Sequence, residues 1–507
     1  MQKQHALKVL DMGIDTHQEP VVFIREDCHV CKSEGFSASN RVAVTTNGFT
    51  MLATLNVVEG DIIPKGYAGF SKAAIKRLKA LPGDEVQFSH PPVLPSLGYV
   101  RKKIFGEKLT PSEIMAIVKD ISQHQYRDIE IASFLSICAG GRLDAEEITN
   151  LTMAMVNCGK TLTWQGQSKI MDKHCVGGVP GNRTTPLVVS IVSAAGLIIP
   201  KTSSRAITSP AGTADTVETL THVNLNLADI QRVVAETGGC LAWGGAVNLS
   251  PADDLLIRIE QALDLDGEGQ LIASMLSKKI ASGSTHAIID IPVGETAKVR
   301  SQEDADRLAD LFYRVGTACG LKVRCIITDG SKPVGRGIGP VEEARDLLAV
   351  LNCEEDSPQD LRDKAILLSA HLLDLAKNDE ENSDISESIK QATDILESGQ
   401  AKKQFERIAQ AQGGLKDLPD AKFFHMETAP NSGVIKEFDN RKLARLAKLA
   451  GAPFTQASGL RLHATVGDTV QTGDPLFTIF SDSSGELDYA MRYYQDNQEL
   501  VCINSET

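Results

Sequence analysis

The first hundred residues alternate short apolar runs with turn signals. The runs VVFI, RVAV and TMLATLNVV, at 21–24, 41–44 and 50–58, are rich in β-branched residues. Glu59-Gly60-Asp61 and Pro82-Gly83-Asp84 have the composition of turns. Because strands are typically short runs of this kind bounded by turns, the pattern predicts a small β-rich domain over residues 1–100.

The pattern becomes helical near residue 110. Thr110 can cap a helix that has Pro111 in its first position and Glu113 reaching back, and Asp144 with Glu147 repeats the arrangement. These signals predict a helical block. Two later helical patterns, at 253–263 and 268–282, are expected to pack on it. The predicted helical domain is therefore discontinuous and comprises residues 101–168 with 250–283.

Helical and strand-like segments alternate from residue 169 onward. Helical patterns at 228–237 and 301–319 are interleaved with the apolar runs CLAW, HAIIDI and KVRCIIT. Such alternation predicts an α/β sheet covered by helices. The C-terminal part returns to short β signals before an amphipathic end at 486–494. The third predicted region, α/β with a C-terminal part, comprises residues 169–249 with 284–507. The predicted fold class is thus α/β with a helical domain and a β-rich N-terminal extension.

Composition narrows the class of partner. The 507 residues carry a formal net charge of −14, and no cluster of lysine and arginine stands out. This balance disfavours binding to nucleic acid or to an anionic membrane, and it favours a small-molecule ligand. A membrane span needs about 20 apolar residues, whereas the longest apolar run, 187–200, is interrupted by Ser190 and Ser193. With no signal-peptide pattern at the start, we expect a cytoplasmic protein.

The ten cysteines are widely spaced, which is typical of reduced thiols. Cys28 and Cys31 have the C-x-x-C spacing, but no second pair follows at the distance of a zinc site. We therefore interpret them as small buried residues rather than as a metal or redox site. The polar stretch at 378–388 is assigned no chemistry.

A glycine-rich segment at 172–185 has the composition of an anion site. It contains Lys173, three glycines and the hydroxyls of Thr184 and Thr185, and a helix-like run follows. Glycines let backbone N–H groups approach an anion closely, and a helix N-terminus adds partial positive charge. The glycine spacing matches neither common nucleotide-binding motif. The segment therefore predicts a phosphate site without predicting a nucleotide fold.

A second segment, 202–213, packs six hydroxyl side chains and Arg205 into twelve residues. It follows a strand-like run and precedes a helix, as the first segment does. Hydroxyls and arginine bind phosphate and sugar oxygens, and loops at strand ends meet where open α/β sheets bind ligands. Together the two segments predict a phosphate site beside a sugar site.

The ordered motifs along the chain resemble those of the thymidine and AMP phosphorylases, in particular the longer subfamily. The motifs are DKHCVGGVPGNRTT, KTSSRAITSPAGTADT, ASMLSKK, IPVGETAKV and SKPVGRGIGP. The resemblance implies a fold of the nucleoside phosphorylase and phosphoribosyltransferase type. It also implies phosphorolysis, in which inorganic phosphate attacks C1′ and releases the base. No redox cofactor or catalytic metal is implied, inorganic phosphate is a co-substrate, and a homo-oligomer is expected.

The resemblance also implies roles for individual residues. Asp266 aligns with the proton donor of the longer subfamily, while His174 and Lys278 match residues near the base. The matched phosphate-site positions are Lys173, Cys175, one or both of Thr184 and Thr185, Ser203 and Thr213. The matched substrate contacts are Gly178, Ser204, Arg205, Ala206, Ile207, Thr208, Ser209, Thr213, Ser274 and Lys298.

Several alternatives stay open. Asp266 could instead cap the helix that begins near Glu268, and Lys278 could be a solvated helix position. Cys175 stands where many family members have serine, and a thiol is a weaker hydrogen-bond donor. The loop from Ser209 to Thr213 departs from the pattern of the shorter enzymes, so both the base and the 5′ group of the substrate are open.

Rival functions are a phosphoribosyltransferase, which would use Mg²⁺ with a diphosphate donor, and a nucleotide-binding protein without turnover. A dinucleotide-dependent dehydrogenase fits less well because the glycine spacing is wrong.

Overall fold

The structure is a computed structural model that describes residues 6–16, 18–36, 41–206, 209–247, 249–263, 265, 267–377 and 384–504. Ile207, Thr208 and Asp266, and residues 378–383 of the polar stretch, lie outside these ranges. The chain divides into two compact units. One is Met1–Arg101 with Gln123–Arg127, and the other is Lys102–Ser122 with Asp128–Thr507.

The first unit is a closed β-barrel. Its strand order is β1-β5-β2-β4-β3-β6, and β6 pairs with β1 to close it. The core is apolar and includes Val22, Val42, Leu55 and Phe70, with Cys28 buried among them. The side chain of Cys31 lies outside the described part. The elements are β1 (Ala6–Asp11), β2 (Val21–Arg25), α1 (His29–Glu34), β3 (Arg41–Thr46), β4 (Phe49–Val58), β5 (Tyr67–Phe70), α2 (Lys72–Leu78) and β6 (Glu85–Ser89).

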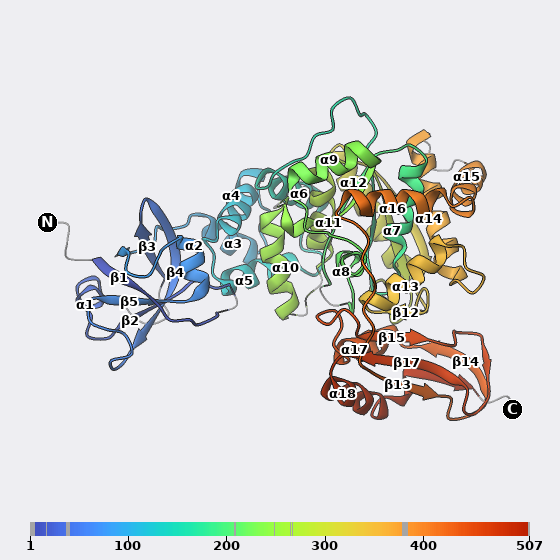
Figure 1. Ribbon diagram of the computed structural model, residues 1–507. Coiled ribbons are helices and arrows are strands. Elements are labelled where there is room, and N and C mark those ends of the chain that lie inside the picture. The colour runs from blue at the N-terminus through green and yellow to red at the C-terminus, as the bar shows by residue number, and fades with distance from the viewer. Residues whose placement is uncertain are drawn as a thin grey trace. The chain divides into compact units, whose positions relative to one another are not determined.

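A bundle of helices opens the second unit. Helices α10 (Pro251–Leu263) and α11 (Glu268–Ala281) pack against α4 (Pro111–Ser122), α5 (Asp128–Cys138) and α6 (Ala145–Asn157), although they are distant in sequence (Figure 1). Helix α3 (Ser96–Ile104) precedes the bundle. Asp144 and Glu147 form the predicted capping box of α6. The boundaries of the three predicted domains stay a prediction.

A parallel sheet forms the centre of the α/β part. Strand β10 (His286–Val293) lies between β7 (Met171–Cys175) and β11 (Lys322–Asp329), with Ile288 opposite Lys173. Strands β8 (Ile199–Ser203) and β9 (Gly239–Trp243) also pair in parallel, and a bridge from Ile170 to Ile198 connects the two groups. Parallel strands require helical crossovers, which explains the alternation in the sequence.

Helices pack against the strands of this sheet and against one another. Helix α7 packs on α14 and α16, α14 packs on β10, and α12 packs on β11. The shared core contains Leu187, Ile191, Leu347, Leu368 and Phe405. The helices are α7 (Thr184–Ala194), α8 (Thr213–Glu218), α9 (Leu227–Thr237), α12 (Gln302–Ala318), α13 (Pro340–Leu351), α14 (Gln359–Lys377), α15 (Ser386–Glu397) and α16 (Gln400–Ala411).

The C-terminal part has its own apolar core, which includes Ile435, Leu446, Phe477 and Ile479. Two small antiparallel sheets, β12-β15-β17-β13 and β16-β14-β18, surround it together with α17 and α18. The elements are β12 (Gly337–Ile338), β13 (Phe423–Thr428), β14 (Gly433–Phe438), α17 (Asn440–Leu449), β15 (Gly459–Leu462), β16 (Thr469–Val470), β17 (Pro475–Ser481), α18 (Ser484–Gln495) and β18 (Val501–Asn504). The predicted fold class, α/β with a helical domain and a β-rich N-terminal extension, is confirmed. In the described ranges no helix has the length and apolar character of a membrane span.

Candidate active site

The loops at the carboxyl ends of the parallel strands meet at one edge of the sheet. Gly178, in the loop after β7, has a φ of +88°, and a Cβ there would lie 2.3 Å from the backbone nitrogen of Lys298, in the loop after β10. A Cβ at Gly181 would lie 2.4 Å from the carbonyl oxygen of Val334, in the loop after β11. These glycines therefore allow three loops to approach backbone to backbone. This edge is where open α/β sheets bind ligands.

A buried lysine sits beneath the glycine-rich loop. Lys173 is 1% exposed, and its Nζ donates to Thr184 Oγ1 at 2.8 Å and to Thr185 Oγ1 at 3.4 Å. Both threonines begin α7, and the first N–H groups of a helix have no partner within it. Burial lowers the pKa of Lys173, with Cys175 and Asp290 opposing the shift. A buried cation, two hydroxyls and a helix N-terminus together suit an anion.

Cys175 is held by protein groups beside this lysine. Asn182 Nδ2 donates to Cys175 Sγ at 3.4 Å and to Asp290 Oδ2 at 3.3 Å, and Lys364 Nζ lies 3.3 Å from that same Asp290 oxygen. Burial and the Asp290 charge raise the pKa of the Cys175 thiol to about 11. The thiol is therefore protonated at neutral pH.

Arg205 shapes the hydroxyl-rich loop, which lies within the segment 202–213. Its guanidinium pairs with Glu218 at 2.6 Å and with Asp215 at 3.1 Å, and it lies 4.8 Å from the ring centroid of Trp243. The bond to Glu218 raises the pKa of Arg205. Asp215 also accepts from the backbone nitrogens of Ala206 and Gly212, at 2.7 and 2.9 Å. Glu218 and Asp215 thus balance the charge of Arg205. The Arg205 guanidinium and the Trp243 ring lie against each other and form one wall of a cavity.

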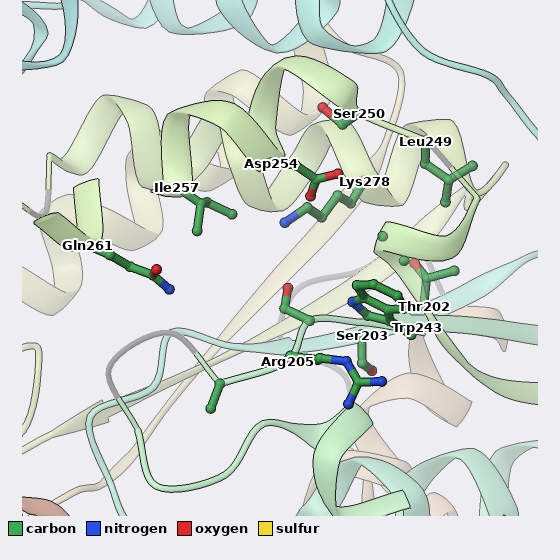
Figure 2. A pocket seen from close by; sticks show the side chains of 14 residues that line it. Thr202, Ser203, Arg205, Trp243, Leu249, Ser250, Asp254, Ile257, Gln261 and Lys278 are labelled. Carbon is green, nitrogen blue, oxygen red and sulfur yellow. The ribbon is translucent and has the colours of Figure 1, made fainter. Parts of the chain in front are cut away.

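That wall belongs to a cavity between the sheet edge and the helical bundle (Figure 2). Figure 2 shows Asp254, Ile257 and Gln261 along α10 on one side, with Arg205 and Ser203 on the other. The lining consists of Thr202, Ser203, Ser204, Arg205, Ala206, Trp243, Gly244, Gly245, Leu249, Ser250, Asp254, Ile257, Gln261 and Lys278.

Three hydroxyls in this lining have no hydrogen-bond partner among the described residues. They are Thr202 Oγ1, Ser203 Oγ and Ser250 Oγ, and all three atoms are buried. A buried polar atom without a partner costs about 1–3 kcal/mol, so such atoms are rare and call for an explanation. The residues that carry them line the cavity, so rotating each hydroxyl toward a polar ligand there would give it a partner.

Buried charges stand behind the cavity. Asp172, fully buried, pairs with Lys201 at 3.1 Å and with Lys279 at 3.2 Å, which connects β7, β8 and α11. Lys278 pairs with Asp253 at 2.5 Å and is not a solvated position. His174 lies among these lysines. Burial, and next the charge of Lys279, lower the pKa of His174 well below its usual range. His174 is therefore neutral at neutral pH.

Most of the residues predicted from the sequence lie along this edge. Lys173, Thr184 and Thr185 form one cluster. Thr213 is connected to it through Arg183, which directly precedes Thr184 and whose Nη1 donates to Thr213 Oγ1 at 3.0 Å. The cavity lining includes Ser203, Ser204, Arg205, Ala206 and Lys278, while Gly178 contacts Lys298. Ser209 donates to Ala211 O at 2.9 Å, and Ser274 is half-buried one turn before Lys278 and outside the lining.

Several charged residues and one aromatic residue of this edge were not predicted from the sequence. They are Asp172, Lys201, Asp253, Lys279, Asp290 and Lys364, together with Trp243. One signal was available, since Asp290 stands inside the otherwise apolar run HAIIDI. A charge in a buried strand needs a partner, so it marks a site or an ion pair. In the described ranges, no three His, Cys, Asp or Glu side chains group as metal ligands.

Comparison with known proteins defines the class. Residues 98–159 match the helical bundle domain of a glycosyl transferase family, and residues 167–402 match the α/β domain of that family. Residues 434–501 match the pyrimidine nucleoside phosphorylase C-terminal domain. The fold and site therefore define a glycosyl transferase with an added C-terminal domain.

Relatives narrow the class further. A protein of Legionella pneumophila (strain Paris) named "Putative thymidine phosphorylase" is 50% identical over 99% of this chain and 96% of its own length. A protein of Hahella chejuensis with the same name is 50% identical over 98% of this chain and 97% of its own length. The chain belongs to the thymidine/pyrimidine-nucleoside phosphorylase family.

Anthranilate phosphoribosyltransferase from Thermus thermophilus shares the fold, with a TM-score of 0.51 and 19% identity. The match covers 62% of this chain and 98% of that one.

Proposed function

We propose that the protein catalyses the phosphorolysis of a pyrimidine nucleoside, and that thymidine and phosphate give thymine and 2-deoxyribose 1-phosphate. The observation that carries the proposal is the cavity whose buried hydroxyls, Thr202 Oγ1, Ser203 Oγ and Ser250 Oγ, have no partner among the described residues. These hydroxyls suit a sugar. Strand β7 lies beside β8, the strand of Thr202 and Ser203, and it contains Lys173, whose cluster suits phosphate. Relatives at 50% identity carry a thymidine phosphorylase name, which favours thymidine as the first substrate to test.

The roles of the residues follow from the chemistry. Lys173 with Thr184 and Thr185 holds phosphate, so that one of its oxygens attacks C1′ while the C1′–N bond breaks. Proximity matters more here than a strong base, because phosphate is already anionic. The bonding electrons leave with the base. Lys278 and neutral His174 stabilise that charge near the cavity.

Asp266 is proposed as the acid that protonates the leaving base. Asp266→Asn removes the proton with little change in shape, so kcat should fall by about 100-fold or more while KM changes little. Steady-state kinetics on thymidine would measure both constants. An unchanged kcat would contradict the acid role.

Base release from a substrate panel tests the proposal. Thymidine, uridine, cytidine, AMP, CMP and UMP are each incubated with and without inorganic phosphate, and free base is quantified by chromatography. We expect phosphate-dependent release from thymidine. No release from any substrate would contradict the proposal. Mg²⁺-dependent turnover with a sugar diphosphate donor would favour a phosphoribosyltransferase instead.

A nucleoside 5′-monophosphate is the second candidate substrate. The contact of Gly178 with Lys298 brings a second lysine to the edge that carries the hydroxyl-rich loop, which would suit a second phosphate group. Lys298→Ala should then lower kcat/KM for a monophosphate by about 10-fold more than for its nucleoside. The exposed Arg300 provides the control Arg300→Ala. Equal losses on both substrates would contradict a 5′-phosphate contact. A homo-oligomer, a cytoplasmic location and independence from cofactors stay proposals.

A further inference from the structure

A glutamate outside the predicted site connects the loops of the sheet edge. Glu343 lies in the first turn and a half of α13 and is 1% exposed. Its Oε2 accepts from Arg183 Nε at 2.6 Å and from Thr216 Oγ1 at 3.0 Å, and its Oε1 accepts from the Gly339 nitrogen at 3.3 Å. The three donors come from three different segments. Arg183 lies in the loop after β7, Thr216 lies in helix α8, and Gly339 lies between β12 and α13.

Arg183 extends these connections to the hydroxyl-rich loop. Its Nη1 donates to Thr213 Oγ1 at 3.0 Å, and its Nη2 donates to the carbonyl oxygen of Ala211 at 2.8 Å. Arg183 also directly precedes Thr184 and Thr185, whose hydroxyls accept from Lys173. One guanidinium fork, fixed by one buried carboxylate, thus sets the positions of both loops predicted to surround phosphate.

We infer that Glu343 is a positioning residue for the phosphate co-substrate, an inference that rests on the proposed phosphorolysis. Its negative charge fixes Arg183 in a geometry that a neutral partner holds less strongly, because charge-assisted bonds are shorter and stronger. Without that charge, Arg183 is free to turn away from Thr213 and Ala211, and the start of α7 moves with it. Displacements of about 1 Å in a binding site are enough to lose much of its function.

The neighbouring glutamate provides a matched control. Glu342 is 4% exposed and its Oε2 also accepts from an arginine Nε at 2.6 Å, in this case Arg461. Its other ion pair is with Arg345, at 3.2 Å. Arg461 belongs to β15 and Arg345 to α13, so Glu342 bonds to neither phosphate-side loop. Glu342→Gln therefore removes an equally buried charge without disturbing the proposed connection.

The experiment compares Glu343→Gln, Glu342→Gln and wild type. Isothermal calorimetry gives the Kd of inorganic phosphate, steady-state kinetics gives the KM values of phosphate and thymidine, and circular dichroism checks folding. For Glu343→Gln we expect the phosphate Kd and KM to rise by about 10-fold or more, with the thymidine KM within about twofold of wild type. For Glu342→Gln we expect all three constants within about twofold of wild type.

Arg183→Lys is the second variant, since Glu343→Gln could unfold. Lysine keeps the charge but cannot reproduce the fork, so the same selective loss of phosphate affinity is expected. Phosphate constants unchanged in a folded variant, or equal rises for phosphate and thymidine, would overturn the inference. A wild type that binds phosphate without releasing base would refute the proposed function alone, and the phosphate Kd values would still decide the role of Glu343. A wild type that binds no phosphate would overturn both.

Discussion

Three buried lysines lie in or beside strand β7, although lysine is rarely buried in proteins. Lys201 and Lys279 share the single carboxylate of Asp172, while Lys173 bonds to threonine hydroxyls. Burial, opposed by the attraction of Asp172, lowers the pKa of Lys279. With Lys364 and its partner Asp290 included, four lysines lie near two buried carboxylates, so positive charge is in excess when these lysines are protonated. A bound phosphate would balance it, which is the residue-scale reason to expect an anion here.

Removing the shared carboxylate should therefore be costly. Asp172→Asn leaves Lys201 and Lys279 buried without a counter-ion, and breaking a buried pair in this way costs about 3–5 kcal/mol. Urea denaturation at pH 7 would measure the loss. The control is Asp128→Asn, because Asp128 is 42% exposed in its pair with Arg258 and should cost about 1 kcal/mol or less. Equal losses in the two variants would show that the buried pairs of Asp172 stabilise the fold no more than an exposed pair does.

His174 predicts a pH effect on stability. Since its pKa is lowered in the folded protein, the unfolded chain takes up a proton below about pH 6.5 that the folded chain does not, so stability falls as pH drops through that value. Each pH unit below it costs about 1.4 kcal/mol per proton. Between pH 7.5 and 5.5 wild type should therefore lose about 1 kcal/mol more unfolding free energy than His174→Gln. Identical losses by denaturant titration would show that His174 is protonated in the folded state.

Among the elements, helix ends follow local sequence rules, whereas strand β7 does not. The capping box of Asp144 and Glu147 was predicted from spacing alone and is confirmed in α6. Strand β7 reads MDKHC and lacks the apolar run by which its neighbours were predicted. It is a strand because β10 pairs with it in parallel, and its charges are tolerated because Lys201, Lys279 and Asp290 lie nearby. Pairings between distant segments are tertiary information that a local pattern does not contain.

The cap on α6 provides a test at this scale. Asp144→Ala removes the acceptor for the Glu147 nitrogen, 2.8 Å away, and should cost about 1 kcal/mol of unfolding free energy. Asp144→Ser keeps a capping oxygen and should retain most of that stability. Urea denaturation of the three proteins gives the comparison. If serine and alanine were equally destabilising, the cap would not be the cause.

Part of the candidate site was predictable because, as for the helix caps, the signal lies in the local sequence. Its glycines and hydroxyls stand in two recognisable segments, 172–185 and 202–213, so their residue types indicated an anion and a sugar. Trp243 was not predicted, because at the end of CLAW it has the appearance of an ordinary strand residue. Only the packing of Arg205 on its ring shows that it forms a wall of the cavity.

At the scale of the second unit, parallel pairing brings together residues that are far apart in the chain. The loops after β7, β10 and β11 touch at Gly178 with Lys298 and at Gly181 with Val334. Arg183 and Glu343 bond across 160 positions of sequence. The cavity adds α10 and α11 from the helical bundle, with Lys278 facing the hydroxyl-rich loop (Figure 2). A phosphate at one end of this edge and a nucleoside in the cavity would be neighbours, as phosphorolysis requires.

Phosphorus NMR of the purified protein with thymidine and inorganic phosphate would follow phosphorolysis itself. We expect the phosphate signal to decline while a sugar phosphate ester appears, with one thymine released for each ester formed. Omitting phosphate should stop thymine release. Thymine released equally well without phosphate, or no ester formed in its presence, would show that the protein is not a phosphorylase of thymidine.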